Sequence, residues 1–243
     1  MIKHYLKVAF RNLMKYKMQS FVSIIGLAVG FTCFALSALW IRYEMTYDNF
    51  HKGSDRIYMV RAHYANEPGT SKFTPYPLME YLQDKMPEIE AATAFTPHHV
   101  KFRLEETEQE VGMIDADSVF MNFFDIQLLK GTVNFLKSDG QEVAITKEFA
   151  KRLFSKEEDA LGKEVEVGRR VCKIGAIVSG WSNHSNIPYN ILAPARHSPR
   201  WGSSNEQLFI RVRERTDIDA FRTKMSTVHI NDIEKRERTF RIC

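Results

Sequence analysis

An uncharged stretch of 21 residues, Phe21–Ile41, constrains the architecture of this chain more than any other feature. An α-helix of this length spans about 31 Å, which matches the hydrocarbon core of a bilayer. Trp40 and Tyr43 lie at its C-terminal end, where aromatic rings favour the membrane interface. Two alternatives usually have shorter uncharged stretches: a soluble core helix, and a cleaved signal peptide, for which Ala35–Ser37 offers a small-x-small pattern. We therefore expect a transmembrane helix over residues 21–41.

Basic residues on the N-terminal side of this stretch give it an orientation. The net charge of +4 comes from five basic residues before Ser20, a segment without acids, so the remainder of the chain is close to neutral. By the positive-inside rule, residues 1–20 stay in the cytoplasm and the large C-terminal part lies outside it. A near-neutral body also argues against nucleic-acid binding, which requires a basic patch on the folded domain.

Four of these basic residues recur at every fourth position and therefore share one face of a helix. They are Lys3, Lys7, Arg11 and Lys15, and apolar residues occupy the opposite side. A basic amphipathic helix of this kind is suited to lying in the membrane interface, in contact with lipid. The alternative is a segment whose charges only set the topology of the span.

Two glycines lie four residues apart within the expected span. Gly26 and Gly30 form a Gly-x-x-x-Gly pattern on one helical face, where small residues let a second helix approach closely. The pattern predicts a helix-packing surface. Its alternative is the ordinary abundance of glycine in membrane helices.

After a membrane-proximal stalk over residues 42–55, residues 56–243 alternate between strand and helix patterns. This alternation predicts an α+β domain with a mixed, mostly antiparallel sheet. The expected strands are Arg56–Tyr64, Val100–Leu104, Glu110–Ile114, Glu142–Thr146, Glu164–Val167, Val171–Ser179 and Gln207–Arg213. The expected helices are Pro77–Met86, Val119–Phe124, Lys147–Phe154 and Asp217–Val228. The acidic segment EETEQ and Gly168 are expected to turn two hairpins.

Sequence motifs for catalysis or for cofactor binding are absent. The chain has no P-loop, no GxSxG and no HExxH, and its three cysteines lack zinc-site spacing. We expect His98 and His99 to be exposed loop or strand-start residues that do not form a metal site. His184 and His197 lie in polar sequence for which no orienting acid is evident. We therefore expect no catalytic, cofactor or metal site, and the remaining alternative is a hydrolase that uses His184 with Ser182.

Five segments carry a resemblance to a known family. They are Arg11–Leu13 (RNL), Gly26–Gly30 (GLAVG), Tyr43–Arg61 (YEMTYDNFHKGSDRIYMVR), Glu142–Val167 (EVAITKEFAKRLFSKEEDALGKEVEV) and Ile174–Ser185 (IGAIVSGWSNHS). In order and spacing they resemble MacB/FtsX-type ABC-transporter permeases. The last segment departs from the family pattern, because Trp-Ser stands near the place of an expected proline.

The resemblance implies a permease in the cell inner membrane that is not itself an enzyme. A separate cytoplasmic ABC ATPase subunit would hydrolyse ATP, and the permease would work as a homo- or heterodimer. Movement of the outer domain would serve export or envelope signalling, in which a periplasmic partner protein could take part. The membrane-proximal residues would have a structural role, fixing the domain on its helix. These residues are Tyr47, Asp48, Phe50, His51, Asp55 and Arg56.

The length of the chain departs from this family. Such permeases return to the membrane after the outer domain, whereas this sequence shows no second apolar stretch and residues 231–243 fit the family worst. We therefore expect either a truncated permease whose domain is incomplete at its C-terminal end, or a single-span relative. A functional alternative is a single-span membrane-anchored sensor or binding module of the cell envelope.

Overall fold

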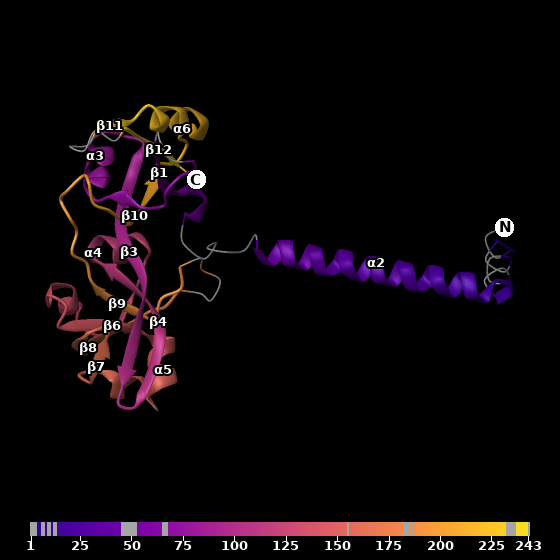
Figure 1. Ribbon diagram of the computed structural model, residues 1–243, viewed down its shortest axis with the longest axis horizontal. Helices are drawn as coiled ribbons and strands as arrows, with labels where there is room; N and C mark the ends of the chain where they lie inside the picture. Colours follow the sequence, from indigo (N-terminus) through magenta and orange to yellow (C-terminus); the bar gives the residue numbers. More distant parts are fainter. Residues whose placement is uncertain are drawn as a thin grey trace. The chain divides into compact units, whose positions relative to one another are not determined.

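A computed structural model describes residues 4–5, 8, 11, 14–44, 53–64, 68–154, 156–181, 185, 187–231 and 237–242. The chain divides into two compact units, Met1–Tyr47 and Asp48–Cys243. The first unit contains helix α2 (Lys17–Glu44), and the second contains a mixed α+β domain (Figure 1). The predicted fold class is therefore confirmed.

Helix α2 is longer than the uncharged stretch from which it was predicted. It has 28 residues, none of which is buried within the structure. Lys17 and Glu44 extend the helix beyond Phe21–Ile41, because backbone hydrogen bonding continues into the polar residues at either end. A helix that is apolar on all sides is typical of apolar surroundings such as a protein core or a membrane.

The domain contains four short α-helices and twelve strands among its described residues. The helices are α3 (Pro77–Lys85), α4 (Ser118–Phe123), α5 (Lys147–Leu153) and α6 (Ile218–Ser226). The strands are β1 (Ile57–Tyr64), β2 (Thr74–Pro75), β3 (Ile89–Leu104), β4 (Thr107–Ala116), β5 (Leu128–Gly131), β6 (Glu142–Thr146), β7 (Glu164–Val167), β8 (Arg170–Val178), β9 (Ile191–Pro194), β10 (Ser204–Val212), β11 (His229–Asn231) and β12 (Glu237–Ile242). Three 3-10 helices, η1 (Ser54–Arg56), η2 (Val133–Lys137) and η3 (Glu157–Ala160), complete the fold.

The strands join into one sheet in the order β11-β12-β1-β10-β3-β4-β9-β6-β8-β5, with β2 and β7 as side branches. Most neighbours are antiparallel, and only β4 with β9 and β6 with β8 pair in parallel among the described strands. Strand β3 belongs to both halves of the domain: its first part pairs with β10, and its second part with β4 and β7. Figure 1 shows β3 running from the end that carries α3 and α6 to the end that carries α5.

Three hydrophobic clusters follow one another along the domain. The upper cluster in Figure 1 packs α3 and α6 against β1, β3 and β10, with Leu82 and Phe221 at its centre. The middle cluster is rich in aromatic rings and gathers α4 around Phe95 and Phe120. The lower cluster packs α5 against β6 and β8 through Phe149. We call the two ends of the domain the upper lobe and the lower lobe, and the aromatic cluster lies between them.

Side-chain caps explain where three of the helices begin. Asp117 accepts a hydrogen bond from the Phe120 amide at the start of α4, and Thr146 accepts one from Phe149 at the start of α5. Asp217 accepts two amide hydrogen bonds in the first turn of α6. Each cap satisfies backbone donors that the first helical turn leaves free.

The expected helices and strands of the domain are confirmed with small shifts at their ends, but the first hairpin is longer than expected. Its turn is Glu105 and Glu106 alone, because Thr107 pairs with Leu104 and Glu105 adopts a positive φ of 53°. The expectation that His98 and His99 lie in a loop or at a strand start is wrong. Both lie inside β3, since pairing with β10 extends this strand back to residue 89.

Candidate functional site

Helix α2 is the only described helix that is long and apolar enough to cross a membrane. Its large apolar side chains are exposed; Phe31, for example, is 70% exposed. The hydroxyl group of Thr32 donates to the carbonyl oxygen of Ala28 at 2.8 Å, so this polar group is satisfied within the helix. Trp40 and Tyr43 pack together at the C-terminal end, with ring centroids 6.3 Å apart. These features suit a helix surrounded by lipid.

Gly26 and Gly30 leave an open notch in α2. A Cβ atom added at either position would have no heavy atom within 4 Å, apart from the helix's own backbone. The notch could therefore receive a second helix at short backbone distance. Within this chain nothing described occupies it, so helix packing at these glycines stays a prediction.

The basic face that precedes α2 is described only in part. Arg11 and Lys15 are helical and exposed, as an interfacial helix requires, whereas Lys3 and Lys7 lie outside the described residues. The amphipathic helix over residues 1–20 stays a prediction.

Most of the predicted membrane-proximal residues also lie outside the described residues. These are Tyr47, Asp48, Phe50 and His51. Asp55 and Arg56 are described and belong to η1, where the chain enters the domain. Gly53 precedes them with a φ of 71°, a conformation that favours glycine.

Arg56 joins three parts of the upper lobe at the point where the chain enters the domain. Its guanidinium donates to the Glu90 carboxylate at 2.6 Å and to the Val212 carbonyl oxygen at 2.9 Å. The start of β1 is thereby fixed to the start of β3 and the end of β10. The contact lies within the domain, so its role in fixing the domain on its helix remains a prediction.

A second group of polar residues, centred on His197, lies where the upper lobe meets the aromatic cluster. His197 belongs to the loop that leads from β9 in the lower lobe to β10 in the upper lobe. Its Nδ1 atom lies 3.2 Å from Glu206 Oε1, and its Nε2 atom lies 3.4 Å from Asp117 Oδ2. Its ring stacks on Tyr76 with centroids 4.0 Å apart. We call these four residues the His197 cluster.

The His197 cluster is held in a charged state. Burial lowers the pKa of His197, but attraction to Asp117 and Glu206 outweighs burial and raises that pKa to about 9. Burial likewise acts to raise the pKa of Asp117, yet the contact with His197 and the Phe120 amide leave it below its ordinary value. At neutral pH a charged imidazolium therefore lies between the side chains of Asp117 and Glu206.

No sequence pattern predicts this arrangement, and the expectation that no acid orients His197 is wrong. Asp117 both caps α4 and faces His197. Tyr76, Asp117 and the pair His197 and Glu206 come from three separate parts of the sequence and are brought together by the fold. Because the imidazole is paired with carboxylates on both sides, the cluster joins α3, α4 and β10 and has no free nucleophile.

The described residues contain no group of three or more His, Cys, Asp or Glu side chains placed to hold a metal ion. His98 Nε2 lies 3.8 Å from Asp115 Oδ1 on the neighbouring strand, while His99 points to the other face of β3. Ser182 and His184, the residues of the hydrolase alternative, lie outside the described residues.

Comparison with known families gives one match over most of the chain. The sequence model described as the MacB-like periplasmic core domain matches residues 20–228, a range that includes both the apolar helix and the domain. A search of curated protein sequences gave no significant match.

Several solved structures share this fold, and two of the three described below are extracellular or periplasmic parts of their proteins. A domain of a protein described as a permease, from Porphyromonas gingivalis, has 20% identity and a TM-score of 0.64, covering 79% of this chain and 91% of that one. The extracellular domain of the noncanonic ABC-type transporter YknZ from Gram-positive bacteria has 13% identity and a TM-score of 0.57, with coverages of 77% and 99%. The periplasmic region of MacB from Actinobacillus actinomycetemcomitans has 12% identity and a TM-score of 0.50, with coverages of 75% and 87%. At these identities the likeness shows the shared fold.

Proposed function

This chain belongs to the family that carries the MacB-like periplasmic core domain, and from that premise we propose that it is a permease component of a MacB/FtsX-type ABC transporter. The observation that carries the proposal is the family match, which includes an apolar helix followed directly by the domain. A periplasmic domain on one N-terminal membrane helix fits the inner membrane. The positive charges before α2 support an N-terminus in the cytoplasm.

In this proposal the chain couples ATP hydrolysis by a separate cytoplasmic subunit to movement of its outer domain. Arg56 supports this role, because it fixes the first strand of the domain to β3 and β10 directly after the chain enters. A displacement that arrives through residues 42–55 would therefore move the upper lobe as a unit. The movement would serve export or envelope signalling.

Purification of the full-length chain from its native membrane, followed by mass spectrometry, tests this proposal. We expect an ABC ATPase to copurify and the complex to hydrolyse ATP. The matched control replaces residues 1–44 with an unrelated single-span anchor, which should keep the domain and lose the ATPase. Recovery of the intact chain in good yield without any ABC ATPase would contradict the proposal.

The notch at Gly26 and Gly30 supports a permease dimer, with a second membrane helix as its occupant. Gly26→Leu with Gly30→Leu should weaken helix association without changing the domain. Crosslinking in native membranes measures this, and Ala28→Leu on another face of the helix is the control. Equal crosslinking in all variants would show that the glycines do not form the contact.

A further inference from the structure

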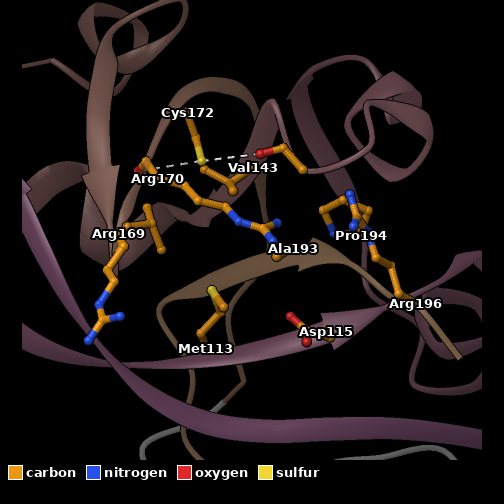
Figure 2. A pocket seen from close by; sticks show the side chains of 11 residues that line it. Met113, Asp115, Val143, Arg169, Arg170, Cys172, Ala193, Pro194 and Arg196 are labelled. Carbon is orange, nitrogen blue, oxygen red and sulfur yellow. Dashed lines mark hydrogen bonds between the residues drawn. The ribbon is translucent and has the colours of Figure 1, made fainter. Parts of the chain in front are cut away.

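A cavity in the lower lobe is lined by residues that belong neither to the His197 cluster nor to the membrane-proximal residues. It has a volume of about 330 Å³ and opens between β4, β8 and β9 (Figure 2). Sites for small molecules in proteins usually have volumes of about 300–1,000 Å³. The cavity therefore has room for a small ligand.

The walls of this cavity combine an apolar floor with a basic rim. Val143, Val167 and Ala193 are buried side chains of the floor. Three arginines, Arg169, Arg170 and Arg196, line the same cavity, with Asp115 as its acidic residue. Apolar walls with a few polar groups are typical of ligand sites, and here the polar groups are mainly cationic.

Arg170 is the guanidinium best placed to receive a ligand. Figure 2 shows its side chain extending across the cavity toward Ala193 and Pro194. No carboxylate among the described residues lies within ion-pair distance of Arg170, whereas Arg196 is bound by the carboxylate and carbonyl oxygens of Asp139. Arg170 thus keeps its five donors available, and a guanidinium with free donors binds carboxylates and phosphates through paired hydrogen bonds.

The backbone around Arg170 leaves room for this guanidinium. Gly140 has a φ of 84°, and a Cβ atom at that position would lie 3.2 Å from Arg170 Nη1. The buried thiol of Cys172 donates to the carbonyl oxygen of Gly140 at 3.2 Å and so helps to hold this turn in place. The guanidinium consequently rests against bare backbone.

Asp115 is the one carboxylate among the residues that line the cavity, and its charge opposes an anion there. His98 lies 3.8 Å away, and Arg170 also acts on it. Burial raises the pKa of the Asp115 carboxyl group, with His98 and Arg170 opposing that effect. The balance of fixed charge in the cavity remains positive.

We propose that this cavity binds a small amphipathic anion, with a carboxylate or phosphate head on Arg170 and an apolar body on the floor formed by Val143, Val167 and Ala193. Arg169 adds a further positive charge to the lining, while the charge of Arg196 is paired with Asp139. The cavity lies within the lower lobe, so the proposal holds whether or not an ATPase partner exists. It gives the outer domain a site at which a small molecule could be recognised.

The test uses the full-length chain in nanodiscs of zwitterionic lipid and isothermal titration calorimetry, with empty nanodiscs subtracted. The probes are hexanoate and hexyl phosphate, which separate a carboxylate head from a phosphate head. Hexan-1-ol and hexylammonium are the neutral and cationic controls. We expect saturable binding of at least one anion, about ten-fold or more tighter than either control. No saturable binding of either anion, or equal binding of hexan-1-ol, would overturn the proposal.

Variants separate the cavity from general surface charge. Arg170→Gln should weaken anion binding about ten-fold or more, and Lys173→Gln, which removes the same charge from an exposed position on β8, should change it less than about two-fold. Asp115→Asn should tighten binding, because it removes the opposing charge. Circular dichroism checks folding, and Arg196→Gln is the second variant if Arg170→Gln unfolds. Equal weakening by Lys173→Gln would refute a specific site.

Discussion

Two phenylalanines show how differently the two units of this protein use the same residue type. Phe31 in α2 is 70% exposed, whereas Phe95 in the domain is fully buried among other rings, with centroids 4.8 Å from Phe120 and 5.5 Å from Phe209. The domain supplies its own apolar surroundings, while α2 has no buried residue in the described structure. Side chains of one chemistry therefore stabilise the fold in one unit, and in the proposed function they would hold the other unit in the membrane.

The largest expected effect comes from removing the buried ring. Phe95→Ala should lower the free energy of unfolding of the domain by about 3–5 kcal/mol, because it opens a cavity in the aromatic cluster. Phe31→Ala should leave that free energy unchanged. Denaturant unfolding of both variants, followed by circular dichroism at wavelengths that report on strands, measures the difference. Equal destabilisation of the domain by both variants would contradict the different roles of the two phenylalanines.

The reverse experiment replaces the exposed ring of Phe31 in α2 with a charged side chain. Phe31→Arg should cost about 3 kcal/mol of membrane insertion, since arginine at a helix centre is unfavourable and phenylalanine is favourable. Unfolding of the domain should be unaffected. A translocon insertion assay measures the inserted fraction, with Phe31→Leu as the control. Full insertion of the arginine variant would show that α2 is not surrounded by lipid.

A pH titration should affect the domain alone. The pKa of His197 in the folded domain is about 9, above the ordinary value of 6.5, so its stabilising effect is complete below pH 6.5 and is lost as the pH rises through 9. We expect the free energy of unfolding to fall by about 2 kcal/mol between pH 6.5 and 8.5. His197→Gln should remove most of this pH dependence. If the variant kept the same pH profile, the dependence would belong to other titratable groups.

The smallest expected effect concerns the caps, which short helices in water need more than a membrane helix does. Asp217→Ala should destabilise the domain by about 1 kcal/mol, because two amides at the start of α6 lose their acceptor. Asp217→Asn keeps an acceptor oxygen and should cost much less. Thermal unfolding distinguishes the two variants, and equal melting temperatures would show that the cap contributes little.

The contrast between the units also explains what the sequence could predict. Helix α2 follows from length and charge alone, and α3 follows from its 3.6-residue period and the proline at its first position. The first part of β3, IEAATAF, has few strand-forming residues and pairs only because β10 lies beside it. Strands β9 and β12 were not predicted for other reasons: β9 (ILAP) is short and contains a proline, and β12 (ERTFRI) is highly charged.

The candidate sites divide in the same way. Gly26 and Gly30 could be named from local spacing, because both lie on one helix. The His197 cluster and the cavity at Arg170 bring together residues from separate strands and loops, and the sheet order that places them is a property of the whole fold. These contacts could not be predicted from the sequence, because the sequence does not show which strands lie side by side.

The unbroken length of β3 has a mechanical consequence. Its 16 residues extend roughly 50 Å. One end is fixed through Glu90 to Arg56, where the chain enters the domain, and the other end forms the tip of the long hairpin. If the fixed end of the strand tilted by about 5°, the tip of the hairpin would move by about 4 Å. In the proposed function, a small movement of the helix in the bilayer that reached Arg56 would therefore cause a larger displacement at the hairpin tip.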